Sequence, residues 1–276
     1  MGTDGFSPSR PMDAAKIATY AGNGWSADKI TCLGEVASTN ALAVKALEER
    51  GAAADRTVIT AESQSAGHGR FGREWFDVPG QGLALSVALG VSTETSSRSL
   101  VLLPLAGAVG VINALEKEHD FHCSLKWPND VSAGGRKIAG AMAEVRWRME
   151  EPKGAVLGIG VNLNNERSEF PGEIAETATS VFMETGRKVE RERFTGALLS
   201  FLGPLLETAF KDPAKLLAEA SACWVHLLGE TIEVVTDGKR KRGRFRGIDE
   251  DGALLLEEEK GVATIRYGDV VNLRRL

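Results

Sequence analysis

The sequence predicts an α+β protein in which a larger domain of helices packed on a sheet is followed by a small all-β domain. Two observations predict the larger domain. The β-branched segment 56–63 and the alternating segment 82–89 are typical of strands, and a long apolar helix pattern at 100–115 follows them without strict strand–helix alternation. The third observation is a change after residue 227, where short strand patterns alternate with glycine-containing turns such as Asp237-Gly238.

These patterns divide the chain into three expected regions. They are an N-terminal arm at 1–29, a larger domain at 30–226 and a small β domain at 227–276.

The composition is that of an ordinary globular protein, with 43% hydrophobic and 26% charged residues. A net charge of −5 argues against a protein whose main task is coating nucleic acid. Three widely spaced cysteines, Cys32, Cys123 and Cys223, suit a reducing compartment. The N-terminus lacks the apolar core of a signal peptide, and the apolar run at 100–115 is shorter than the roughly 18 residues of a membrane span. We therefore expect a cytoplasmic protein without a membrane partner.

The first helix of the larger domain has clear end signals. Ser38, Thr39 and Asn40 form a capping cluster, and Gly51 marks the stop. The residues expected to face the core are Ala41, Leu42, Val44, Ala46 and Leu47.

The second half of the larger domain reads as a group of strands followed by helices. Strands are expected at 124–131, 136–147 and 155–163, with short turns at 132–135 and 150–154 between them. The polar segment that follows, up to residue 180, has little periodicity and predicts a mobile loop. Residues 191–210 and the stretch to Trp224 predict helices.

The loop SAGHGRFGREW at 65–75 matches the letters of a dinucleotide-binding fingerprint through Gly67, Gly69 and Gly72. Its context excludes that interpretation, because Pro79 and the glycines beside it prevent the required helix and a strand follows instead. A P-loop is excluded as well, since Arg-Glu follows the last glycine in place of lysine and serine or threonine. The loop is therefore a connection between two strands.

Three basic side chains give this loop a preference for anions. Glycine lets backbone N–H groups approach a ligand, and the guanidinium groups of Arg70 and Arg73 can pair with carboxylate or phosphate, with His68 beside them. The alternative is that these are solvated charges on a turn.

Two further motifs carry groups suited to ATP chemistry. LKWPNDV supplies Lys126, Asn129 and Asp130 in one turn, and Lys137 follows at the start of a strand. The lysines can neutralise developing negative charge, while the amide and carboxylate can hold a divalent ion or hydroxyl groups. Asn162 ends a glycine-bearing strand. Each motif alone is also explained by an ordinary turn.

Five motifs follow one another along the chain. They are STN at 38–40, ESQSAGHGRFGREW at 62–75, KWPND at 126–130, GRKIAGAMAEV at 135–145 and GIGVNLN at 158–164. In their order and spacing they resemble those of biotin protein ligases, and the resemblance extends from about residue 31 to 276. The closing RGIDEDGALLLEEE resembles that family's C-terminal domain.

The resemblance implies a catalytic domain like that of class II aminoacyl-tRNA synthetases and a small SH3-like barrel. It implies a ligase that converts biotin and ATP, with Mg²⁺, into biotinyl-adenylate and then transfers biotin to a lysine of a biotin carboxyl carrier protein or carboxylase carrier domain. No DNA partner is expected, because the segment before the motifs is too short for a winged helix, and the family suggests a homodimer on ligand binding.

The resemblance also assigns roles to residues of this chain. Arg70 and Lys137 act on the reacting groups, Arg73, Trp75, Lys126, Asn129 and Asn162 serve ATP, and Asp130 serves the metal. The biotin site comprises Ser38, Thr39, Asn40, Gln64, Gly67, His68, Gly69, Arg70 and Lys137. Loops 65–75 and 163–180 are expected to act as lids that exclude water from the adenylate. His68 departs from the arginine usual in the family.

Several alternatives remain open. A lipoate ligase shares the domain type, and a non-catalytic nucleic-acid-binding regulator would bind DNA in a salt-dependent manner. The run HDFHC at 119–123 contains metal-binding residue types without a standard zinc spacing, so a helix end is favoured. The basic run at 239–247 is favoured as a solvated hairpin because acidic runs share its domain.

Overall fold

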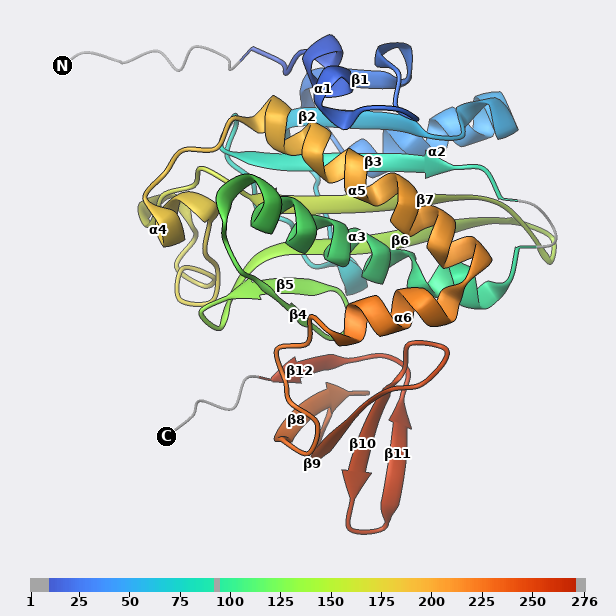
Figure 1. Ribbon diagram of the computed structural model, residues 1–276, viewed down its shortest axis with the longest axis vertical. Coiled ribbons are helices and arrows are strands. Elements are labelled where there is room, and N and C mark those ends of the chain that lie inside the picture. The colour runs from blue at the N-terminus through green and yellow to red at the C-terminus, as the bar shows by residue number, and fades with distance from the viewer. Residues whose placement is uncertain (1–9, 92–94, 272–276) are drawn as a thin grey trace.

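The computed structural model describes residues 10–91 and 95–271, which form a seven-stranded sheet with helices and a separate five-stranded sheet (Figure 1). The predicted α+β class is confirmed. The large sheet has the order β1-β2-β3-β7-β6-β5-β4, in which only β1 and β2 pair in parallel. Its strands are β1 (Ile30–Val36), β2 (Thr57–Gln64), β3 (Gly82–Leu89), β4 (Ser124–Lys126), β5 (Asp130–Ala133), β6 (Arg136–Arg148) and β7 (Glu151–Asn162).

Helices cover both faces of this sheet, and most of them lie on one face. Figure 1 shows α3 and α5 crossing one face, with α2 behind the sheet on the other. The helices are α1 (Ala14–Ala21), α2 (Thr39–Arg50), α3 (Ser97–His119), α4 (Val181–Thr185), α5 (Arg191–Lys211) and α6 (Pro213–Ser221).

The period of two along the central strands separates the two faces. Leu85 of β3 pairs with Ile159 of β7, and both are buried in the main core with α3 and α5. Ser86 and Gly158, which pair one position along, face the other side, where Ala88 and Val156 contact α2. Small residues on that second face leave room for a pocket.

The predicted helix after the capping cluster is confirmed as α2. The Ser38 side chain accepts a hydrogen bond from Ala41 N, and Gly51 with φ 55° follows the last turn. The expected inward positions are confirmed at Val44 and Leu47, which are buried, and wrong at Ala41, which is exposed. Ala43, which was not expected to face inward, is fully buried against the sheet.

The apolar run at 100–115 is part of a longer helix than expected. Helix α3 is long and apolar enough to cross a membrane, because it extends over 23 residues. However, 78% of its most apolar 18-residue stretch is buried inside the protein. We interpret it as the central core helix.

Residues 10–29 of the expected arm are structured. Helix α1 lies in them and packs on α5, with Ile17 fully buried in the main core. Residues 1–9 of the arm lie outside the described part. The strands β6 and β7 also extend further than expected, so that their turn is at Met149 and Glu150 and not at 150–154.

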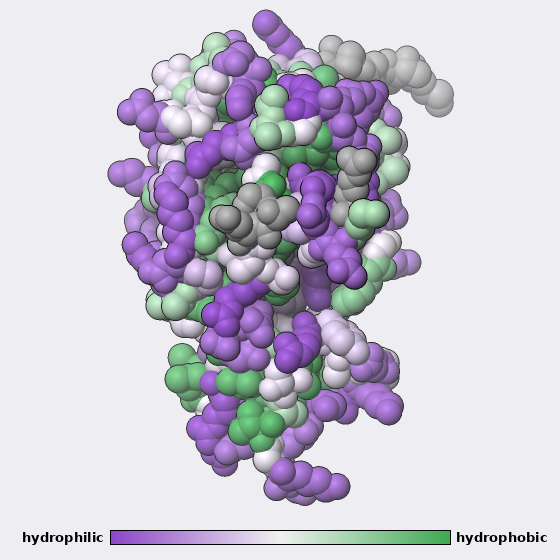
Figure 2. All heavy atoms as spheres, turned by 90° about the vertical axis from the view of Figure 1, so that its right-hand side faces the viewer, coloured by the Kyte–Doolittle hydropathy of each residue, from purple (hydrophilic) through white to green (hydrophobic). Residues whose placement is uncertain are grey.

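The small domain is an antiparallel sheet of order β11-β10-β9-β8-β12, below the large sheet in Figure 1 and at the lower end of the molecule in Figure 2. Its core contains Phe245 together with Trp127 of the larger domain, whose Nε1 donates to Gly252 O at 2.9 Å. One tryptophan therefore belongs to the KWPND turn and to the second core. The strands are β8 (Thr231–Thr236), β9 (Lys239–Ile248), β10 (Leu254–Glu258), β11 (Gly261–Ile265) and β12 (Asp269–Val271).

The close approach of α1 to α5 predicts a stability effect at Gly196. A Cβ there would overlap Tyr20 Cβ and lie 2.7 Å from Ile17 O. Gly196→Ala should lower the free energy of unfolding by about 1–3 kcal/mol, because the helices must move apart. Chemical denaturation measures this, with Gly172→Ala as control, since a Cβ at Gly172 meets nothing within 4 Å. Equal stability of the two variants would contradict the packing.

Candidate functional site

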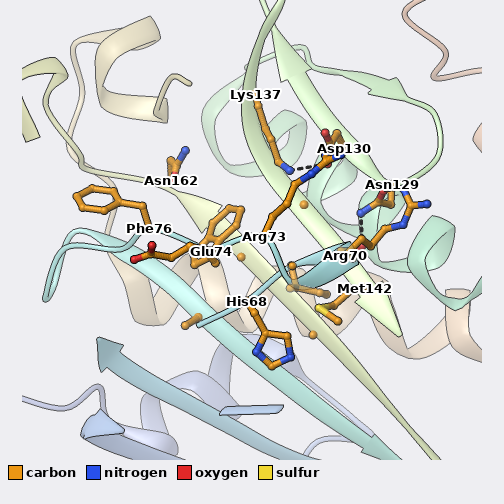
Figure 3. A pocket seen from close by; sticks show the side chains of 18 of the residues that line it. His68, Arg70, Arg73, Glu74, Phe76, Asn129, Asp130, Lys137, Met142 and Asn162 are labelled. Carbon is orange, nitrogen blue, oxygen red and sulfur yellow. Dashed lines mark hydrogen bonds and ion pairs between the residues drawn. The ribbon is translucent and has the colours of Figure 1, made fainter. Parts of the chain in front are cut away.

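A pocket of about 250 Å³ opens on the face of the large sheet that carries the small residues (Figure 3). It gathers residues from the start of α2, from five strands of the large sheet (β2, β3, β5, β6 and β7), from the 65–81 loop, from the 163–180 segment and from β12. Of the residues expected at the site, the pocket is lined by Ser38, Thr39, Asn40, Gln64, His68, Gly69, Arg70, Arg73, Trp75, Asn129, Asp130, Lys137 and Asn162.

Glycines of β7 make the floor of the pocket. A Cβ on Gly158 would overlap the Asn40 amide, and a Cβ on Gly160 would overlap the Trp75 ring. The Asn40 and Trp75 side chains therefore occupy space that the side chain of any residue other than glycine would fill at positions 158 and 160. The floor fixes the distance between α2 and the Trp75 loop.

One end of the pocket is a network of uncharged polar side chains at the start of α2, which is bonded to the Glu144 carboxylate outside the pocket lining. Asn40 Oδ1 accepts from Ser86 Oγ at 2.6 Å, and Asn40 Nδ2 donates to Glu144 Oε1 at 2.8 Å. Thr39 donates through its backbone N and its Oγ1 to Gln64 Oε1, at 2.9 and 3.0 Å. Oriented donors and acceptors of this kind suit a planar urea-like group.

The glycine-rich loop is closed by its own backbone. Trp75 N donates to Gly67 O at 2.9 Å, and Gly69 N donates to Arg73 O at 2.7 Å. A Cβ on Gly67 would lie 2.8 Å from Gln64 Nε2. Gly67 does not line the pocket. Its lack of a side chain nevertheless lets the loop approach the polar end of the pocket.

Arg70 connects the loop to both domains. Its Nη1 donates to Asn129 Oδ1 at 3.0 Å and lies 3.8 Å from Asp269 Oδ1 (Figure 3 shows the Asn129 bond). Its side chain is 25% exposed, and burial lowers the pKa of its guanidinium, while Asp269 and Asp130 counteract that effect. Arg73 forms an ion pair with Asp269 as well.

Lys137 supplies the second cation at this end. Its Nζ lies 2.7 Å from Asp130 Oδ1 and 5.7 Å from the centre of the Trp75 ring. Lys126 does not line the pocket. Burial lowers the pKa of its amine, and the opposite effect of Asp130 and Asp269 is smaller. The pocket thus has a polar end at α2 and a cationic end at Arg70 and Lys137.

The 163–180 segment lies against the cationic end and is tied to it by backbone bonds. Lys137 N donates to Thr177 O at 2.7 Å, and Thr179 N donates to Lys137 O at 2.8 Å. Asn162 Nδ2 donates to Thr179 O at 3.0 Å, so this expected ligand residue also anchors the segment. Its role as a lid stays a prediction.

His68 lies on the loop beside the polar end, where Figure 3 shows its ring pointing away from Lys137. Its Nε2 is 3.8 Å from Glu144 Oε1, and its side chain is 43% exposed. The structure therefore pairs the histidine with the same carboxylate that holds Asn40.

The acidic side chains at the site are too few to hold a metal ion without additional groups from a bound ligand. Among residues 10–91 and 95–271, no three His, Cys, Asp or Glu side chains lie close enough to hold a metal ion. Asp130 Oδ1 is paired with Lys137, and its other oxygen has no hydrogen-bond or ion-pair partner among those residues. Mg²⁺ is commonly held by one or two carboxylates plus substrate phosphates, which fits this arrangement.

Sequence reasoning missed several residues in and around the pocket. Glu144 does not line the pocket and lies within the GRKIAGAMAEV motif, yet its role depends on Asn40, which is 104 residues away in the chain. Asp269 had no signal at all, because it reaches the site only when the small domain docks. The other pocket residues not foreseen include Glu74, Phe76, Met142, Phe170, Ile174, Thr177 and Ala178.

Two family models match the chain. The model described as the biotin/lipoate A/B protein ligase family matches residues 34–162, and the biotin protein ligase C terminal domain matches residues 227–271. The two models match the larger domain up to residue 162 and the small domain, and residues of both matched segments line the pocket.

Curated relatives agree with these models. The biotin--[acetyl-CoA-carboxylase] ligase of Mycobacterium tuberculosis is 31% identical over 271 residues, covering 96% of this chain and 97% of the relative. The enzyme of that name from Paracoccus denitrificans is 32% identical, covering 84% and 96%. The bifunctional ligase/repressor BirA of Bacillus subtilis is 29% identical over 225 residues, and the match spans 79% of this chain but only 66% of that relative.

A solved structure gives the same result. The biotin protein ligase from Aquifex aeolicus in complex with biotin and ATP superposes with a TM-score of 0.73 at 28% identity, covering 87% of this chain and 96% of that one.

The contact between Asp269 and the loop predicts a local effect without a global one. Asp269→Ala should change the free energy of unfolding by less than about 1 kcal/mol, because the ion pairs are partly exposed. It should speed tryptic cleavage after Arg70 and Arg73 severalfold, since the loop loses its partner. Glu259→Ala, an exposed charge of the same domain, is the control. Equal cleavage rates in both variants would contradict the contact.

Proposed function

The chain belongs to the biotin protein ligases, and from this membership we propose that it joins biotin to ATP as biotinyl-5′-adenylate and transfers biotin to a lysine of a carboxylase carrier protein. The observation that supports this most is the pocket with a neutral polar end and a cationic end. Biotin has the same two ends, a ureido ring and a carboxylate. The ring lies at Asn40, Thr39 and Gln64, and the carboxylate reaches Arg70 and Lys137.

The first step is an attack of the biotin carboxylate on the α-phosphorus of ATP. A new P–O bond forms, the bond to the β-phosphate oxygen breaks, and pyrophosphate leaves. The barrier comes from bringing two anions together, and the two cations of the pocket reduce it by charge and positioning. Lys137 is 2.7 Å from Asp130 in the free protein, so a phosphate oxygen has to compete with that carboxylate.

In the second step the neutral amine of the carrier lysine attacks the acyl carbon of the adenylate. An amide bond forms, AMP leaves, and the proton of the amine is released. No covalent bond to the enzyme is needed. The adenine is expected against Trp75, which is held over Gly160, and Arg73 and Asn129 are expected at the phosphates.

Mg²⁺ is proposed at Asp130 together with the phosphates, where it would add positive charge to the leaving group. Lys126 is half-buried and does not line the pocket, and we propose that it contributes charge without direct contact.

The experiment that tests the function is incubation with labelled biotin, ATP and an apo carrier domain of acetyl-CoA carboxylase. Label should reach the carrier only when ATP is present. Transfer of lipoate in place of biotin would favour the lipoate alternative, and the absence of ATP–pyrophosphate exchange with both biotin and lipoate would contradict both. A cytoplasmic location and a homodimer on ligand binding remain proposals, tested by fractionation and by light scattering with and without biotin and ATP.

Removing the cation at Lys137 should affect the first step. Lys137→Met should lower the rate of biotin-dependent ATP–pyrophosphate exchange by about 10²- to 10³-fold, because a charge aimed at the reacting phosphate is lost. Lys153→Met, on the distant end of β7, should leave the rate unchanged. A full exchange rate in Lys137→Met would show that this lysine is not at the reacting groups.

The loop is predicted to retain the adenylate. Arg70→Gly removes the contacts to Asn129 and Asp269 and should speed release of biotinyl-adenylate into solution, measured by filtration of labelled product. His68→Arg should keep or tighten biotin affinity in isothermal titration, because the full charge next to Glu144 is then permanent. Unchanged release from the Arg70 variant would contradict the lid.

A further inference from the structure

The small domain presents a row of arginines on its outer face. Strand β9 alternates between the faces of its sheet, so that Phe245 points inward and is 2% exposed. Arg240, Arg242, Arg244 and Arg246 are all exposed, and we call these four side chains the arginine row. They come from the basic run that the sequence explained only as a solvated hairpin.

Ion pairs with neighbouring acidic side chains involve only two of the four arginines in the row. Arg240 and Arg246 form ion pairs with acids of β8 and β10, at 2.5 and 2.7 Å. Arg242 and Arg244 have no ion pair within 4.0 Å in the part of the chain that the structure describes. Two guanidinium groups at the centre of the row are therefore available to a partner.

The arginine row is continuous with the rim of the pocket. Asp269 of β12 pairs with Val235 of β8, and Val235 pairs with Arg240 of β9. Residues opposite one another in antiparallel strands point to the same face, so Asp269 and Arg240 share the outer face of the sheet. Asp269 also lines the pocket and pairs with Arg73. A protein that inserts a side chain into the pocket past this rim must lie beside the row.

We propose that the arginine row is a docking surface for an acidic face of the carrier domain. This inference rests on the proposed function, which requires a carrier lysine to enter the pocket. Charge attraction between complementary faces speeds encounter and sets the orientation in which that lysine arrives.

The charge pattern favours a protein over a nucleic acid as the occupant. Glu233 and Glu257 lie on the same face, directly opposite Arg242 and Arg244 in the sheet register. Carboxylates among the arginines repel a continuous phosphate backbone, whereas a protein surface can match a mixed pattern. The net charge of −5 adds a long-range repulsion for nucleic acid.

The test reverses the two unpaired charges in the full-length enzyme. The variant Arg242→Glu/Arg244→Glu is compared with Lys16→Glu/Lys211→Glu, which changes the net charge equally on exposed positions of α1 and α5. The substrate is the apo carrier domain that the unaltered enzyme labels. Two rates are measured, kcat/KM for transfer to the carrier at low and high salt, and biotin-dependent ATP–pyrophosphate exchange, which needs no carrier.

The arginine variant should lose about tenfold in kcat/KM for the carrier at low salt, with most of the loss gone at high salt. Its exchange rate should equal that of the unaltered enzyme, which also shows that it is folded, and the lysine control should be unaffected in both. Carrier kinetics that are equal in the arginine and lysine variants would overturn the proposal. The proposal would also be overturned if the arginine variant lost binding to a short DNA duplex while its carrier kinetics stayed unchanged, because that result would assign the row to nucleic acid. If the unaltered enzyme shows neither exchange nor transfer, the proposed function itself fails.

Discussion

The whole site depends on the absence of side chains on one face of the central strand β7. At Gly158 and Gly160 the neighbours Asn40 and Trp75 stand where a Cβ would be. One residue along the same strand, Ile159 points to the opposite face and packs in the main core. Strand alternation thus lets β7 act as the centre of the core on one side and as the floor of the pocket on the other. A bulky residue at either glycine would close the pocket without weakening the sheet pairing.

The cations of the pocket are held in place by acidic side chains. Lys137 is paired with Asp130, and Arg70 and Arg73 with Asp269. These pairs keep the basic groups in place and lower their repulsion, so the ligand meets a preorganised set of charges. The cost is competition, because a carboxylate or phosphate must replace the resident acid. A loop that can exchange one anionic partner for another is suited to closing over a reactive intermediate.

The sequence predicted elements where local signals suffice, and failed where two distant segments meet. The Ser38 cap and the Gly51 stop defined α2 correctly, because both act within a turn of the helix. The face of α2 could not be assigned in the same way, since Ala43 is buried by the sheet and not by its own neighbours. The motifs located most of the pocket through family resemblance. Asp269 was missed because no local feature records where the small domain docks.

The small domain contributes a residue to the pocket and is not an appendage. Its inner face holds Trp127 of the KWPND turn, and its edge strand β12 brings Asp269 to the glycine-rich loop. Both contacts depend on the same domain orientation, so a rotation that breaks one would break the other. The position of the small domain is thereby coupled to the loop that carries Arg70. A carrier that binds the outer face of this domain would act on the loop through β12, which links recognition of the protein substrate to the conformation of the loop over the adenylate.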